Sequence, residues 1–280
     1  MCELMAMSFD APVSADFSIR EFGARGEENP DGWGLGWYPD RSLAMIKQPV
    51  RWGASRLAGF LEAAGEIHAR ILLAHVRYKT VGDDPSHADT HPFTREWGGR
   101  DYVFAHNGTL EGPAWHLPLG NYRPVGETDS ERFFCHLLGE IAGRGKPLDT
   151  PDDWNWLHET LASANRFGKL NVLLSDGHRL FIYHDVNGWK GLNFRKIRVR
   201  EGHHRYFGDE EISIEISGPA LNHGFVVATC PLSRAGWHSF RLGELIVFER
   251  GEIVYSSHRS PRSPEFAPME DGMPVRATGT

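Results

Sequence analysis

Short runs of apolar residues, more than helical periodicity, dominate the pattern along the chain and predict a strand-rich fold. The run at residues 71–76 is nearly continuous, which is typical of a buried strand. Shorter strands are expected at residues 3–9 and 102–106. In the second half of the sequence, strands are expected at residues 170–175, 179–184, 211–216, 224–230, 244–249 and 252–256.

Helical spacing is clearest in three stretches. Residues 55–69 place their apolar side chains on one helical stripe. Thr128 and Glu131 have the spacing of a capping box, and the helix that they predict runs to about Ala142. A third helix is expected over residues 152–166. Helices and strands are thus mixed along the chain, which favours an α+β fold with two sheets and helices outside them.

Glycine and proline mark the boundaries of these elements. Residues 29–32 have turn composition, and residues 33–37 alternate bulky side chains with Gly34 and Gly36. That alternation suits a strand whose backbone is closely approached. No linker or repeat divides residues 1–256, so we expect one domain there. Residues 257–280 are rich in Ser, Pro, Arg and Gly, and we expect a mobile C-terminal tail.

Composition and charge exclude several classes of protein. The 280 residues carry a net charge of −7, whereas a general nucleic-acid binder would present a basic face. No apolar run approaches the ~20 residues of a membrane span, and the N-terminus lacks the features of a signal peptide. Three scattered cysteines are too few for a disulfide framework, so we expect a cytoplasmic protein. The oligomeric state is left open.

The sequence also gives no reason to expect a cofactor or a metal. The glycines of residues 31–38 do not have the GxGxxG spacing of a dinucleotide site. His87 and His91 are four residues apart, but they lie in a polar loop and not on a helix. Cys135, in a helical pattern, and Cys230, in an apolar run, are interpreted as small core residues.

The first candidate for chemistry is Cys2, which directly follows Met1. If Met1 is removed, Cys2 carries a thiol and a free α-amino group on one residue. A free thiol titrates near pH ~8.5 and an α-amino group near ~7.7–8.0, so the amine can accept the thiol proton near neutral pH. The alternative interpretation is an arbitrary residue in a disordered terminus.

Four further groups follow predicted strands or begin a predicted helix: Arg77, Thr80, Asn107-Gly108 and Asp129. Asn107 and Gly108 can supply a side-chain amide and a backbone N–H to an oxyanion, although Asn-Gly is also a strong signal for a tight turn. Arg77 can hold a carboxylate with two hydrogen bonds, or it can be a solvated strand end. Asp129 can bind an ammonium group, or it can be a helix-stabilising acid in a first turn. Together with Cys2, these groups describe a site that hydrolyses the side-chain amide of glutamine.

Several blocks of the sequence resemble the class II glutamine amidotransferases of the N-terminal-nucleophile (Ntn) hydrolase superfamily, and most of all their short, stand-alone YafJ-type branch. The matching blocks are MCELMAMS at residues 1–8, DGWGLGWY at 31–38, AHVRYKT at 74–80, THPFTRE at 90–96, AHNGTL at 105–110, RPVGETDSE at 123–131, NVLLSDG at 171–177 and VVATCPL at 226–232. The resemblance implies a four-layer αββα sandwich of two mainly antiparallel sheets.

The resemblance also assigns roles to individual residues. It implies that Cys2 is the nucleophile, with its own α-amino group as base, and that Asn107 and Gly108 form the oxyanion hole. Arg77 matches the arginine that binds the substrate α-carboxylate, with Thr80 near it in the same loop. Asp129 matches the acid that binds the substrate ammonium group. In the block before the oxyanion strand, His91 is assigned a supporting role.

Three functional hypotheses are compatible with these residues. The first is a glutaminase that passes ammonia to a separate synthase, because the sequence leaves no room for a synthase domain of its own. The second is a hydrolase that acts on the γ-glutamyl amide of a larger metabolite, as ergothioneine-pathway members of the superfamily do. The third is a binding or regulatory module without turnover, which is disfavoured because every matched position holds a chemically competent residue.

Overall fold

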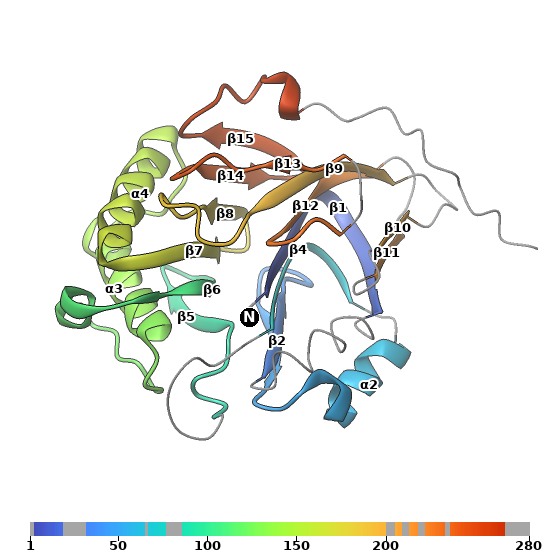
Figure 1. Ribbon diagram of the computed structural model, residues 1–280, viewed down its shortest axis with the longest axis horizontal. Helices are drawn as coiled ribbons and strands as arrows, with labels where there is room; N and C mark the ends of the chain where they lie inside the picture. The colour runs from blue at the N-terminus through green and yellow to red at the C-terminus, as the bar shows by residue number, and fades with distance from the viewer. Residues whose placement is uncertain are drawn as a thin grey trace, which may run out of the picture.

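The computed structural model describes residues 3–18, 32–64, 67–76, 86–199, 205–208, 213–217, 222–232 and 236–266. Two antiparallel sheets pack face to face (Figure 1). The nine-stranded first sheet comprises β1 (Glu3–Ser18), β2 (Trp33–Trp37), β3 (Ala44–Gln48), β4 (His68–Val76), β9 (Asn193–Val199), β10 (Arg205–Gly208), β11 (Ser213–Ser217), β12 (Asn222–Ala228) and β13 (His238–Ser239). The six-stranded second sheet comprises β5 (Phe93–Trp97), β6 (Arg100–Leu110), β7 (Gly168–Ser175), β8 (Arg179–Tyr183), β14 (Leu245–Glu249) and β15 (Glu252–Ser256).

Strand order places β1 and β6 between two neighbouring strands in their sheets. The first sheet runs β13-β9-β12-β1-β4-β2-β3, with β11 paired to β1 and β10 paired to β11. The second sheet runs β15-β14-β8-β7-β6-β5. All of the strand pairings described are antiparallel. Interior strands are rigid supports, so side chains at their ends are held in defined positions.

Helices cover the outer faces of both sheets. The α-helices are α2 (Arg56–Ala64), α3 (Asp129–Gly143) and α4 (Pro151–Ala164), and the short 3₁₀ turns are η1 (Trp52–Ala54), η2 (Gly112–His116), η3 (Asn165–Phe167) and η4 (Pro264–Phe266). In Figure 1, α3 and α4 flank the second sheet on the left and α2 lies at the lower right. The expected four-layer αββα sandwich is therefore confirmed.

Successive side chains of a strand point to opposite faces of its sheet, so both faces of each sheet carry apolar residues. These residues form three apolar layers: one outside each sheet and one between the sheets. On β1, Leu4 and Ala6 pack between the sheets, together with Ala105 of β6. Met5 and Met7, which point the other way, pack with α2. The outer face of the second sheet packs against α3 and α4 through a separate cluster that includes Phe104, Phe134, Leu137, Leu157 and Val172. The layer between the sheets extends toward the start of β1 and the end of β6, where the candidate site residues of the sequence analysis occur.

Several boundaries differ from the sequence predictions. The first strand continues from the predicted end at residue 9 to Ser18, and β4 begins at His68 because the helix predicted over 55–69 ends at Ala64. Residues 257–266, expected to start a mobile tail, are packed: Arg259 pairs with the buried Glu244, and Phe266 joins the layer between the sheets. Residues 267–280 of the expected tail lie outside the described residues.

The cysteine expectations are met in one case only. Cys135 is fully buried in α3, as predicted. Cys230 is half-buried in a bend, because β12 ends two residues earlier, at Ala228. Interpreting Cys230 as a core residue within a strand was therefore wrong.

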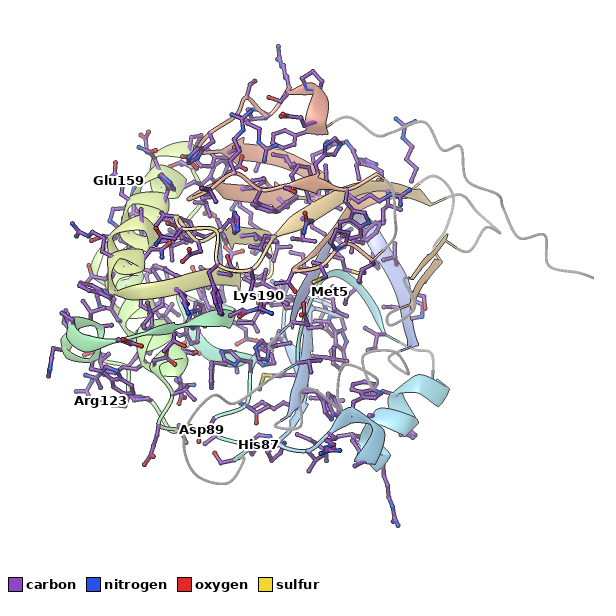
Figure 2. The ribbon with its side chains drawn as sticks, in the orientation of Figure 1. Met5, His87, Asp89, Arg123, Glu159 and Lys190 are labelled. Carbon is purple, nitrogen blue, oxygen red and sulfur yellow. The ribbon has the colours of Figure 1, made fainter. Side chains whose placement is uncertain are left out.

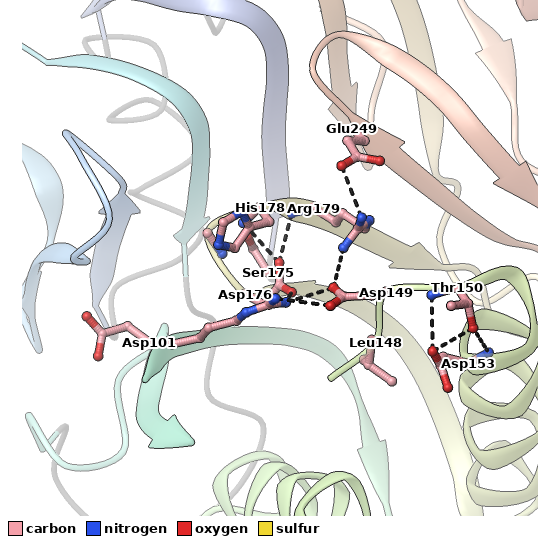
Figure 3. Close-up of polar contacts among 12 residues, drawn as sticks. Asp101, Leu148, Asp149, Thr150, Asp153, Ser175, Asp176, His178, Arg179 and Glu249 are labelled. Carbon is pink, nitrogen blue, oxygen red and sulfur yellow. Dashed lines mark hydrogen bonds and ion pairs between the residues drawn. The ribbon is translucent and has the colours of Figure 1, made fainter. Parts of the chain in front are cut away.

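Charged side chains tie the second sheet together at the end where β6 begins (Figure 3). Arg100 donates to Asp149 at 2.9 Å and to Asp176 at 2.8 Å. Arg179 donates to Asp149 at 2.6 Å and to Glu249 at 3.1 Å. The hydrogen bond from Arg100 is the main reason that the pKa of Asp149 is lowered. The network joins β6, β8 and β14 to the α3–α4 connection.

A first prediction concerns Asp153, which forms a capping box with Thr150 at the start of α4 (Figure 3). Burial alone would raise the pKa of Asp153, but hydrogen bonds from Lys146, Thr150 and Arg144 lower it well below its ordinary value. The carboxylate therefore stabilises the fold above the unfolded pKa of ~3.9, and this contribution is lost as the pH falls below that value. Asp153→Asn is expected to cost about 2 kcal/mol of unfolding free energy at pH 7.

Urea unfolding at pH 7 and near pH 2 tests this expectation. The deficit of the Asp153→Asn variant should shrink at the lower pH, where the wild-type carboxylate loses its advantage. Asp152→Asn is the matched control, because Asp152 is exposed and one residue away. An equal deficit at both pH values would contradict the electrostatic origin of the effect.

Candidate active site

The relative orientation of the sheets is fixed at one end by Tyr38, which follows β2. Its hydroxyl donates to the carbonyl oxygens of Asp101 at 2.6 Å and Ser175 at 3.2 Å, while its backbone N–H donates to Ile71. Ile71 lies in the first half of β4 and Asp101 at the start of β6. The other ends of β4 and β6 therefore both point toward the opposite end of the sandwich.

The start of β1 lies at that opposite end, beside the end of β4. Glu3 is in register with Val76. Cys2 and Arg77 are bonded to these two residues, and both lie outside the described residues, as does Thr80. Glu3 and Val76, to which these two residues are attached, are therefore neighbours at one end of the first sheet.

Buried hydrogen bonds hold the first residues of β1 in place. Thr229, just beyond β12, donates its hydroxyl to the Glu3 carboxylate and accepts from Leu4 N at 3.2 Å. Thr229 N donates to Leu4 O at 3.0 Å, and Asn193 donates to Thr229 O at 3.0 Å. This confirms that the sequence after Cys2 is drawn into a sheet. The partner, Thr229, is 226 residues from Glu3 and was not singled out from the sequence.

Asn107 and Gly108 lie within β6 and do not form a tight turn. They are in register with Asn171 and Leu170 of β7, so the turn interpretation was wrong. The buried Asn107 is on the face of β6 that points toward the first sheet, like Ala105 two residues earlier.

Glycine is required at position 108 by close packing on the other face of β6. A Cβ atom there would lie 2.0 Å from the carbonyl oxygen of Lys169 and 2.6 Å from Nε2 of His106. Both distances are far below van der Waals contact. Only a residue without a side chain fits beside Asn107, which gives the Asn-Gly pair a structural reason independent of turn formation.

Asp129 joins the end of β6 from the first turn of α3. Its Oδ2 accepts a hydrogen bond from Leu110 N at 2.6 Å. Next to it, Ser130 Oγ lies 2.9 Å from His106 Nδ1, and His106 Nε2 lies 3.0 Å from Lys169 O. Because a carbonyl oxygen only accepts, Nε2 carries a proton, and in a neutral ring Nδ1 is then the acceptor. The sequence did not single out His106 as the link between β6 and α3.

Thr128 caps α3 as predicted, but the capping box is only half formed. The Thr128 hydroxyl accepts from Glu131 N at 3.1 Å. The Glu131 carboxylate does not return to Thr128; it accepts from Val125 N at 3.1 Å and Gly126 N at 2.7 Å, and it pairs with Arg95. Glu131 therefore shapes the loop that leads into Asp129.

His91 is buried at the same end of the molecule, before a cis proline. Its ring lies 4.2 Å from that of His75 and 4.6 Å from that of Phe93, centroid to centroid. On β4, His75 is opposite both Leu4 and Gly34. A Cβ on Gly34 would lie 2.1 Å from His91 O, which confirms the predicted close approach to β2. Periodicity could not reveal the His75–His91 contact, because His75 lies on β4 of the first sheet and His91 lies in the connection that leads to β5 of the second sheet.

Lys47 supports the loop that carries His91. Its ammonium donates to Thr90 O at 2.7 Å and Pro92 O at 3.3 Å. Burial lowers the pKa of Lys47 to about 8.

Within the ranges described above, no group of three or more His, Cys, Asp or Glu side chains is arranged to hold a metal ion. The helices of the described part of the chain are all too short or too polar to cross a membrane.

The sequence and the fold are similar to those of several known proteins. YafJ of Escherichia coli (strain K12), designated a glutamine amidotransferase, is 33% identical over 264 residues, which cover 91% of this chain and 100% of YafJ. The crystal structure of a predicted glutamine amidotransferase from Pseudomonas aeruginosa PA01 matches with a TM-score of 0.71 and 27% identity, over 91% of this chain and all of that chain. A gamma-glutamyl-hercynylcysteine sulfoxide hydrolase of Mycolicibacterium smegmatis is 28% identical over 158 residues, 54% of this chain and 60% of the relative.

The family model for class-II glutamine amidotransferases matches residues 1–271. That match spans both sheets, from the residue before Cys2 to beyond η4. It includes the start of β1 and the ends of β4 and β6. The chain belongs to the class II glutamine amidotransferases, in agreement with the YafJ-like character of its motifs.

Proposed function

We propose that this protein hydrolyses the side-chain amide of glutamine with Cys2 as the nucleophile. The main support is the register of Glu3 with Val76, which places the attachment points of Cys2 and Arg77 side by side. Leu4 and Ala6 of β1 face the second sheet, and Asn107 of β6 faces the first sheet, so the proposed reaction takes place between the two sheets. Asp129 reaches the same end of β6.

The proposed reaction begins at the amino terminus. After removal of Met1, the α-amine of Cys2 takes the thiol proton, and the thiolate attacks the glutamine Cδ. Asn107 and Gly108 donate to the oxyanion that forms. The amine passes the proton to the departing nitrogen, so that ammonia leaves and a γ-glutamyl thioester remains on Cys2. Water attacks the thioester, gives its proton to the same amine, and releases glutamate and the free thiol.

The remaining residues of the proposed site bind the amino-acid part of the substrate. Arg77 binds the α-carboxylate through two hydrogen bonds, with Thr80 beside it. Asp129 binds the α-ammonium group, and its bond to Leu110 N fixes the carboxylate relative to the oxyanion strand. His91, packed on His75, keeps a supporting role in shaping the pocket.

A second candidate is hydrolysis of a γ-glutamyl amide larger than glutamine. The similarity to the hydrolase of M. smegmatis, whose name contains a γ-glutamyl group, favours this reaction. The chemistry at Cys2 is the same, and only the group that leaves with the nitrogen differs. If glutamine is the substrate, a separate synthase that accepts ammonia is the partner implied by the family.

Product analysis with the purified protein tests the proposal. Glutamine should give equal amounts of glutamate and ammonia, and mass spectrometry should show a chain that begins at Cys2. Product release only from γ-glutamyl conjugates would favour the second candidate. A protein that begins at Cys2 and hydrolyses neither kind of compound would contradict both, and leave a binding module as the remaining explanation.

A further inference from the structure

A row of buried polar side chains continues from Asn107 across the second sheet. Between the sheets, the apolar layer includes neighbouring residues of four strands: Ala105, Leu173, Ile182 and Ile246. At the end of this layer that carries the site, the next row consists of Asn107, Asn171, His184 and Glu244, all of them buried. Asn107 is in register with Asn171, and His184 N donates to Glu244 O at 2.9 Å. Buried polar groups at this position need partners.

Two members of this row, Asn171 and His184, bond to backbone atoms of the loop that follows β8. Asn171 donates to Trp189 O at 2.6 Å and accepts from Asp185 N at 2.9 Å. His184 Nε2 lies 3.1 Å from Lys190 O, and the Asp185 carboxylate accepts from Trp189 N at 3.1 Å. Lys190 has a φ of 49°, an uncommon value for a residue with a side chain. Figure 2 shows Lys190 on the side of the second sheet that faces β1.

In this loop, the indole of Trp189 contacts the side chain of Lys169. Lys169 lies on β7, next to β6, the strand that carries the proposed oxyanion hole. The Lys169 ammonium lies 3.7 Å from the ring centroid of Trp189. Lys169 is exposed and directly opposite Thr109, on the same face of the sheet as Asn107 and Asn171. No ion pair joins Lys169 to a carboxylate of the described residues, and Trp189 Nε1 is buried without a hydrogen-bond partner among them. The indole of Trp189 therefore positions the Lys169 ammonium, and no carboxylate of the described residues pairs with it.

Strand order places this pair on the leaving-group side of the site. The proposed amino-acid ligands approach from β4 and from α3, which packs on β5 and β6. Lys169 and Trp189 lie beyond β6 in the other direction, on β7 and the loop after β8. If the glutamyl group is bound by Asp129 with its Cδ at Asn107, the side of β6 that it leaves open is the side on which Lys169 and Trp189 lie.

We propose that Lys169 and Trp189 form a subsite for a carboxylate attached to the amide nitrogen, so that the preferred substrates are γ-glutamyl amino acids. The inference rests on the proposed function and names the substrate class of the same site. Attack by Cys2 breaks the amide bond, and the amino acid leaves as a free amine that carries the transferred proton. Its carboxylate pairs with the Lys169 ammonium, while its Cα lies against the indole.

Two compounds that differ only in charge test the subsite. γ-Glutamylglycine ends in a carboxylate, and γ-glutamylglycinamide ends in a neutral carboxamide of nearly the same shape. The wild-type protein is expected to show a kcat/KM about fivefold higher for the acid, which corresponds to one exposed ion pair of ~1 kcal/mol. Raising the salt concentration from ~0.05 M to ~0.5 M should reduce this preference.

Variants separate Lys169 from general charge effects. Lys169→Met should bring the kcat/KM ratio of the acid to the amide close to one, and Trp189→Leu should lower it. Lys146→Met is the matched control, because it removes the same charge from a lysine that pairs with Asp153 near α4. The control should retain the wild-type ratio, and thermal unfolding of each variant reports whether it is folded.

The outcomes distinguish the inference from the function on which it rests. Equal hydrolysis of the two compounds by the wild type, or a ratio unchanged by Lys169→Met in a folded protein, would overturn the subsite. Hydrolysis of glutamine alone would also overturn it, while the proposed function would stand. Release of no product from glutamine or from either compound would remove the proposed function and the inference with it.

Discussion

Replacing Cys2 with alanine is expected to reduce the release of glutamate and ammonia to the uncatalysed background. Alanine keeps the α-amine but has no atom that can form the γ-glutamyl thioester, and loss of a nucleophile that acts with its base typically costs a factor on the order of 10⁶. The fold should be unaffected, because Thr229 holds Glu3 and Leu4 and no described contact depends on the Cys2 side chain. Ammonia release and thermal unfolding, measured on the same preparation, separate these two effects.

Cys135→Ala is the matched control for this prediction. Cys135 is fully buried in α3, and burial raises the pKa of its thiol, so it is unreactive near neutral pH. Its removal should lower stability by about 1 kcal/mol and leave turnover in place. A thiol reagent should likewise label Cys2 in the folded protein and spare Cys135. Turnover that persists in the Cys2→Ala variant would eliminate the whole assignment.

The elements that the sequence predicted well are those whose signal is local. Residues 71–76 are the last six residues of β4, and the Thr128 cap starts α3 where expected. Asn107-Gly108 shows the limit of local signals. Taken by itself the pair favours a tight turn, but pairing of β6 with β7 over its whole length keeps it extended.

The features that the sequence could not predict depend on contacts between distant parts of the chain. Thr229 forms a hydrogen bond with Glu3, which lies 226 positions away in the sequence. The ring of His75 on β4 contacts the ring of His91, which lies in the connection before β5. Phe266 is similar: in a Ser- and Pro-rich segment it gave no periodic signal, yet it fills a gap between the sheets. Periodicity indicates which face of an element is buried, but it does not indicate the partner across the core.

Asn107→Ala is expected to lower kcat by a factor on the order of 10²–10³ and to change KM little. An oxyanion donor strengthens its hydrogen bond as negative charge develops, so its loss raises the transition state more than the bound ground state. Asn107 is buried at the end of the apolar layer, in register with Asn171, so thermal unfolding of the variant is measured beside its kinetics. Asn155→Ala, on an exposed position of α4, is the matched control and should retain wild-type kinetics.

The kinetic parameters also distinguish oxyanion stabilisation from the other roles that Asn107 could have. If the side chain bound the substrate amide equally in the ground and transition states, Asn107→Ala would raise KM and leave kcat intact. If it controlled ionisation of Cys2, alkylation of that thiol by iodoacetamide would slow in proportion to kcat. Stabilisation of the oxyanion predicts a fall in kcat with an unchanged alkylation rate, because alkylation forms no oxyanion. Asn107→Asp should lose still more kcat than Asn107→Ala, since a carboxylate at the same position repels the developing charge.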